Sequence, residues 1–308
     1  MFRSILVPLD GTRFAEAALP VAARLARSSR ARLRLLLAHQ PTAALVGLGE
    51  ITAADPGIDQ ALQAEERVYL SSTVARFGPS GDGPVTTNQI DGPAGEAICS
   101  EASLVGADLI VMATHGRSAL GRLWLGSVSN HVIRHSGLPV LLIHPNRMER
   151  VLERQSGVGI LVALDLSPFS EAVLEPVVQL ASLLQAHITL LHVVEPNYHT
   201  GETATPYPLE QDATVTEVRR SDAQRRLDEV THRLRAQGLS AAARVMIAPN
   251  AAAAVLQALE NEKYDVAAMT THGTGGMRRL FLGSVADKVV RSAGKPVLIL
   301  RPGPAPEE

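Results

Sequence analysis

A chain of 308 residues is long enough for two domains that each bury a hydrophobic core. The chain has 29 Lys and Arg residues and 31 Asp and Glu residues, which gives a net charge of -2. It therefore lacks the excess of positive charge with which proteins bind the phosphate backbone of nucleic acids. Hydrophobic residues make up 46% of the chain but aromatic residues only 3%, so the core must be aliphatic, which suits parallel strands covered by helices.

Strands and helices alternate along the first half. Apolar or alternating runs predict strands at residues 4–9, 33–39, 85–90, 108–113 and 139–143. Helical spacing of apolar residues predicts helices at 15–26, 60–77, 94–105 and 127–135. Alternation of this kind requires crossover connections, so we expect an α/β fold with a doubly wound parallel sheet.

Two stretches of the first half recur in the second. The run Ile5-Leu-Val-Pro-Leu-Asp10 returns as Ile160-Leu-Val-Ala-Leu-Asp165, and residues 115–145 align without gaps to 272–302. A repeat this long indicates duplication of a whole domain. The expected boundaries are a first domain at 1–145, a linker at 146–157, a second domain at 158–303 and a tail at 304–308.

The carboxyl ends of the strands are where such sheets bind ligands. Asp10 follows the first strand, and Gly116 and Gly126 lie between the fourth strand and a helix that begins near Ser127. Glycine lets backbone N–H groups approach a phosphate, the helix N-terminus adds partial positive charge, and an aspartate can accept bonds from a ribose or an adenine amine. The pattern predicts a nucleotide, although the same residues would also serve a plain turn and an ordinary helix cap.

Together these motifs resemble the universal stress protein family. The resemblance rests on the Ile5–Asp10 run, on Asp108-Leu-Ile-Val-Met-Ala-Thr-His-Gly116 and on the stretch Gly126–Val140, and it covers nearly the whole chain twice. It implies two Rossmann-like domains of the adenine nucleotide alpha hydrolase type, each with five strands in the order 3-2-1-4-5.

ATP-binding members of that family carry a Gly-x2-Gly-x9-Gly-[Ser/Thr] signature. Both halves keep its last two glycines and its serine, but the first position holds Ala113 in one half and Thr270 in the other. Alanine adds only a methyl group, whereas threonine is bulkier. The second half also has Ala163 where the first has Pro8, so it departs further from the family pattern.

The resemblance implies an adenine-nucleotide site in each half, made mostly of backbone contacts. The residues expected in the first half are Pro8, Asp10, Gln40, Met112, Ala113, Gly116, Gly126, Ser127, Val128 and Ser129. Those expected in the second half are Asp165, Val193, Met269, Gly273, Gly283, Ser284 and Val285. The expected ligand is ATP, with or without Mg²⁺.

The histidine and cysteine residues form no pattern that predicts catalysis, metal binding or a reactive thiol. No nucleophile or carboxylate stands near His115 or His272 at a spacing typical of a catalytic pair, so no catalytic residues are expected. His131 and His135 have the i, i+4 spacing of metal ligands, but the second half does not repeat it, so no metal site is expected. Cys99 is expected to be a small core residue. The histidines that end the second strands, His39 and His192, are expected to be buried with their hydrogen bonds satisfied.

The leading hypothesis is an ATP-binding regulator of the stress response that acts through nucleotide-dependent conformation and partner binding, with at most weak ATP hydrolysis. Two alternatives stay open: a nucleotide-independent interaction module, and slow ATP hydrolysis or autophosphorylation at Ser127 or Ser129. Expected partners are the nucleotide, a second copy of the chain and unidentified protein clients, but neither nucleic acid nor a membrane. A single cysteine and the lack of a signal sequence at Met1–Asp10 favour a cytoplasmic location.

Two expectations concern larger segments. The long loops 41–57 and 196–209 are predicted to act as lids or partner-binding surfaces at the ligand edge. The strands at 139–143 and 296–300 are apolar sheet edges, and the two halves are predicted to pair about them.

Overall fold

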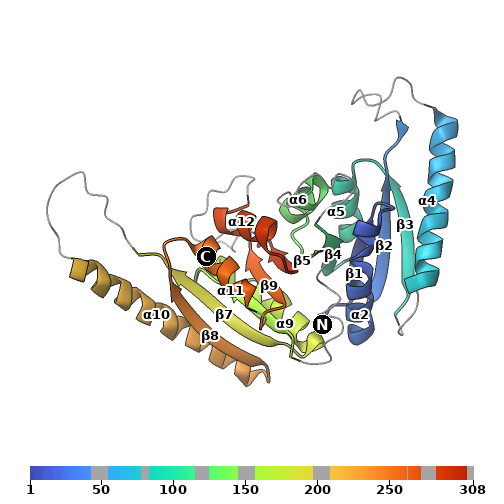
Figure 1. Ribbon diagram of the computed structural model, residues 1–308. Helices are drawn as coiled ribbons and strands as arrows, with labels where there is room; N and C mark the ends of the chain where they lie inside the picture. Colours follow the sequence, from blue (N-terminus) through green and yellow to red (C-terminus); the bar gives the residue numbers. More distant parts are fainter. Residues whose placement is uncertain are drawn as a thin grey trace, which may run out of the picture. The chain divides into compact units, whose positions relative to one another are not determined.

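The computed structural model describes residues 1–42, 55–77, 83–114, 125–144, 157–196, 209–261, 263–271 and 282–303, and Figure 1 shows its elements. Two compact units divide the chain, one formed by Met1–Glu153 with Leu298–Gly303 and the other by Arg154–Val297 with Pro304–Glu308. The expected linker lies outside the described residues except for Gly157.

The first half of the chain contains five parallel strands in the order β3-β2-β1-β4-β5, as expected. Their bounds are β1 (Ser4–Leu9), β2 (Arg32–His39), β3 (Val85–Asp91), β4 (Leu109–Ala113) and β5 (Val140–Ile143). The helices are α1 (Arg13–Glu16), α2 (Leu19–Ser29), α4 (Pro56–Phe77), α5 (Ala94–Leu104) and α6 (Ser127–His135). Strands β1, β4 and β5 are buried along their whole length, as is typical of parallel strands whose two faces are covered by helices.

The second half repeats this arrangement, with the strand order β8-β7-β6-β9-β10. Its strands are β6 (Gly159–Ala163), β7 (His187–Val194), β8 (Ser240–Ile247), β9 (Val266–Thr270) and β10 (Val297–Leu300). Its helices are α8 (Pro168–Glu171), α9 (Leu174–Leu184), α10 (Leu209–Ala236), α11 (Ala251–Glu260) and α12 (Ser284–Ser292). The expected doubly wound α/β class is therefore confirmed.

One helix expected in the first half is two. The apolar spacing over 15–26 suggested a single helix, whereas α1 ends at Glu16 and α2 begins at Leu19. Pro20 stands in the first turn of α2, and a proline has no N–H to continue the hydrogen bonds of a preceding helix. The chain therefore turns between Ala17 and Ala18 and starts a new helix.

The long helix of each half packs on the outer strands of that half. Figure 1 shows α4 along β2 and β3, and α10 along β7 and β8. An ion pair occurs at matching positions in the two halves: Arg76 with Glu16, and Arg233 with Glu171, both at 2.9 Å. These shared pairs relate α4 to α10 residue by residue.

Three further expectations from the sequence concern the lid loops, the pairing of the two halves and membrane-spanning helices. The two predicted lid loops fall largely on residues 43–54 and 197–208, outside the described residues. The pairing of the halves about their last strands stays a prediction. No helix in the described residues is both long and apolar enough to cross a membrane.

Candidate functional site

The carboxyl ends of β1 and β4, which are neighbouring strands, lead into the residues expected to bind the nucleotide. Asp10 follows β1, and Thr114 follows β4. The N–H of Gly126 donates to the carbonyl oxygen of Thr114 at 3.3 Å, so α6 begins directly beside the end of β4. The second half repeats the contact, because the N–H of Gly283 donates to the carbonyl oxygen of Thr271 at 2.7 Å.

The two helices that start here begin without a side-chain cap, as α2, α5 and α9 also do. Thr12, Ser167 and Asn250 cap α1, α8 and α11 with a side-chain acceptor. In contrast, α6 and α12 begin after Gly126 and Gly283, which provide no side chain for this bond. The first turns of α6 and α12 therefore lack a side-chain acceptor from the capping residue, at the edge where an anion is expected.

The two serines at the start of α6 lie in different surroundings. Ser127 is exposed and is the first helical residue. Gly126 holds the cap position, so the hydroxyl of Ser127 does not cap α6. Ser129 is 3% exposed, and its Oγ donates to the carbonyl oxygen of Ala113 at 3.4 Å. That buried bond joins α6 to β4.

The two aspartates after the first strands fold their own loops. Oδ1 of Asp10 accepts from the N–H of Thr12 at 2.9 Å and from its Oγ1 at 2.6 Å. Oδ1 of Asp165 accepts in the same way from Ser167, at 3.0 Å and 2.6 Å. The spacing Asp-x-Thr and Asp-x-Ser is typical of such turns and could have predicted this structural role.

The other expected ligands occupy positions of three kinds. Pro8 lies inside β1, opposite Leu36 of β2. Buried strand residues of the set are Met112, Ala113 and Met269, and exposed or half-buried ones are Gln40, Val128, Val193, Ser284 and Val285. Gly116 and Gly273, with His115 and His272 before them, lie outside the described residues.

The two departures from the glycine signature are accommodated within their strands. Ala113 is 8% exposed at the end of β4, and Thr270 is 7% exposed at the end of β9. Both side chains are covered by the surrounding protein. Neither departure therefore presents a large exposed group at the carboxyl edge.

The remaining candidates are the possible metal ligands and Cys99, which is half-buried rather than part of the core. Among the described residues, no cluster of three or more His, Cys, Asp or Glu side chains could hold a metal ion. Burial raises the pKa of the Cys99 thiol, which keeps it protonated and poorly nucleophilic near neutral pH. Burial and the nearby Glu16 carboxylate also raise the pKa of Tyr69 on α4.

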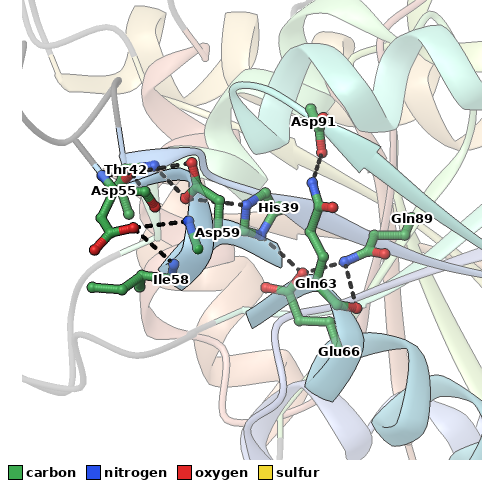
Figure 2. Close-up of polar contacts among 10 residues, drawn as sticks. His39, Thr42, Asp55, Ile58, Asp59, Gln63, Glu66, Gln89 and Asp91 are labelled. Atoms are coloured by element: carbon green, nitrogen blue, oxygen red, sulfur yellow. Dashed lines mark hydrogen bonds and ion pairs between the residues drawn. The ribbon is translucent and has the colours of Figure 1, made fainter. Parts of the chain in front are cut away.

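The two histidines expected at the ends of the second strands differ: His39 ends β2, whereas His192 lies inside β7, two residues before its end. His192 Nδ1 lies 2.8 Å from the carbonyl oxygen of Leu164, as a satisfied histidine should. His39 is 1% exposed, and Figure 2 shows it between the carboxylates of Asp59 and Glu66 on α4. Sequence analysis missed this cluster, because its members lie 20 and 27 residues from His39 along the chain.

Comparison with known proteins places these features in a family. The model of the universal stress protein family matches residues 1–144 and 159–301. A universal stress protein of Mycobacterium tuberculosis is 28% identical over 198 residues, which span 63% of this chain and 62% of the relative. One from Thermus aquaticus is 33% identical over 147 residues, 46% of this chain and 99% of the relative.

The fold agrees with a solved structure of the same family. The crystal structure of a universal stress protein from Archaeoglobus fulgidus matches 97% of this chain and 98% of its own, with 18% sequence identity and a TM-score of 0.70. Because the two family segments cover nearly the whole chain, the protein belongs to the universal stress protein family, with two tandem family domains.

Proposed function

We propose that this protein binds an adenine nucleotide, ATP, at the carboxyl ends of β1 and β4, with a second, equivalent site at β6 and β9. The observation that carries the proposal is the start of α6 and of α12. Each begins at a Gly-Ser pair bonded to the end of the neighbouring strand, with no side-chain bond from its capping residue. Backbone N–H groups at such a helix start are suited to phosphate oxygens.

The rest of the nucleotide would lie toward the end of β1. Asp10 uses one carboxylate oxygen for Thr12, and its half-buried side chain remains at the sheet edge. A carboxylate there suits hydroxyl or amine donors of the nucleoside. Any Mg²⁺ would come bound to the phosphates, since that ion commonly keeps several waters and substrate oxygens as ligands.

In this proposal the protein works as a binding protein. Nucleotide occupancy would alter the loops at the sheet edge and so the binding of protein clients or of a second copy of the chain. A nucleotide-independent interaction module is the competing function, and it predicts no bound nucleotide in the purified protein. Mass spectrometry of small molecules released from the native protein separates the two.

The substitution Gly126→Asp tests the phosphate end of the site. A Cβ at Gly126 would meet the nearest atoms, Thr114 O and Ser129 Oγ, at 3.5 Å and 4.0 Å, and φ is -58°, so the variant should fold. Its carboxylate would repel phosphate, so calorimetry should show loss of the first-half site. Gly126→Ala adds the same Cβ without charge and should retain most of the affinity. Equal ATP affinity in wild type and Gly126→Asp would contradict the phosphate assignment.

A further inference from the structure

The cluster around His39 holds a buried imidazole against two acidic side chains. His39 Nδ1 lies 3.0 Å from Oε2 of Glu66, and Nε2 lies 3.8 Å from Oδ1 of Asp59. Both carboxylates come from α4, while His39 is the last residue of β2, so the cluster joins the helix to the sheet (Figure 2). Its place is the carboxyl edge of the first half.

The hydrogen bonds of this imidazole suit its charged form. A neutral imidazole has one N–H donor, whereas an imidazolium has two. Nε2 makes no hydrogen bond among the described residues, although it is buried and directed toward a carboxylate. If Nδ1 donates to Glu66, the neutral ring turns a lone pair toward Asp59. The imidazolium presents an N–H to each carboxylate.

The carboxylates are held in place whatever the charge of the ring. Glu66 Oε2 also accepts from Nε2 of Gln89 on β3. Asp59 accepts from the N–H of Thr42 at 2.8 Å and from its Oγ1 at 3.0 Å. These donors do not titrate near neutral pH, whereas an imidazole in general can change its charge there.

Other charged groups on the neighbouring elements have partners of their own. Asp91 on β3 accepts from Gln63, and Asp55 accepts from the N–H groups of Gly57 and Ile58 at the start of α4. Beyond the end of β1, Asp10 binds Thr12. The ion pair of Arg34 with Glu101 of α5 lies on the opposite face of β2, because successive strand residues alternate between faces.

The second half shows that the fold does not need this cluster. Strand registers and the shared ion pairs match three members, His39, Glu66 and Gln89, to residues of the other half. Val194 matches His39, Ala223 matches Glu66 and Val245 matches Gln89. Val194 and Ala223 are 5% and 3% exposed, so apolar side chains fill the corresponding positions. The polar cluster is an addition specific to the first half.

We propose that His39 is a proton switch that controls how firmly α4 is attached to β2. With a proton, the imidazolium pairs with both carboxylates and holds the helix to the carboxyl end of the strand. As the pH rises, the ring loses its charge and the attachment weakens. The switch stands independently of the nucleotide site, and α10, which packs on β7 with Val194 where β2 has His39, lacks it.

Hydrogen exchange provides the first test, with α10 as the control inside the same chain. After correction for intrinsic rates, the protection of α4 amides should fall about tenfold between about pH 5.5 and pH 8, the range in which histidine titrates and in which a charge-assisted bond is lost. Protection of α10 should stay level. Parallel profiles for α4 and α10 would overturn the proposal.

Nitrogen-15 NMR of the imidazoles tests the charge directly. His39 should take up a proton within the same pH range, and a ring that stays neutral throughout overturns the switch. His39→Gln keeps a side-chain donor without a titrating charge, so α4 should lose its pH dependence. If that variant does not fold, the triple variant His39→Val, Glu66→Ala, Gln89→Val, which follows the pattern of the second half, serves instead. Persistence of the pH dependence in either variant also refutes the proposal.

Discussion

Leu166 adopts a backbone conformation that L-amino acids rarely adopt. Its φ is 67°, and the matching residue of the first half is Gly11 with φ of 81°. The left-handed region costs a side-chain-bearing residue about 1–2 kcal/mol, part of which is offset by the greater freedom of glycine in the unfolded chain. Leu166→Gly should therefore raise the free energy of unfolding by about 0.5–1 kcal/mol in urea titrations. Gly11→Leu should lower it, and an unchanged midpoint for that variant would contradict the strain.

Asp10 combines a structural and a proposed binding role, which two substitutions can separate. Asp10→Ala should weaken both ATP and adenosine binding by about 1–3 kcal/mol, the range for a lost bond to a charged group. Thr12→Ala removes the helix cap but keeps the carboxylate, and should cost about 1 kcal/mol of stability with little loss of affinity. Calorimetry and thermal unfolding of both variants give the comparison. Unaltered affinity in Asp10→Ala would remove this residue from the site.

Between elements, the attachment of α5 to the sheet depends on a buried ion pair. Arg34 Nε donates to Glu101 Oε1 at 2.7 Å, and Asn88 donates to the other carboxylate oxygen at 3.1 Å. The Glu101 side chain is 0% exposed and that of Arg34 is 22% exposed, so Glu101→Ala should cost about 2–3 kcal/mol, somewhat less than a fully buried pair.

The ion pair of Arg76 with Glu16 is the control for that prediction. Its arginine side chain is 54% exposed, so solvent screens the interaction. Glu16→Ala should lower the free energy of unfolding by less than about 1 kcal/mol. If urea titrations gave equal losses for Glu16→Ala and Glu101→Ala, burial would not be what distinguishes the two pairs.

For the whole molecule, the duplication predicts two nucleotides per chain. Gly126 and Gly283 occupy matching cap positions beside the ends of β4 and β9. Native mass spectrometry should therefore find two bound nucleotides in the wild type, one in either Gly126→Asp or Gly283→Asp, and none in the double variant. A wild type that binds one nucleotide, lost only in Gly126→Asp, would show that the second domain has kept the fold without the site.

Sequence alone determined the order and type of the elements, the strand order through the family resemblance, and the duplication. These follow from local signals: apolar periodicity, glycine positions and motif spacing. The turn of Asp10 with Thr12 could also have been predicted from the sequence, because the two residues are only two positions apart. Tertiary structure alone decided that His39 meets Glu66 and that Arg34 meets Glu101, across 27 and 67 residues. The physical reason is that such pairs depend on where a helix lies across a sheet, and a polar residue in an amphipathic pattern does not specify its distant partner.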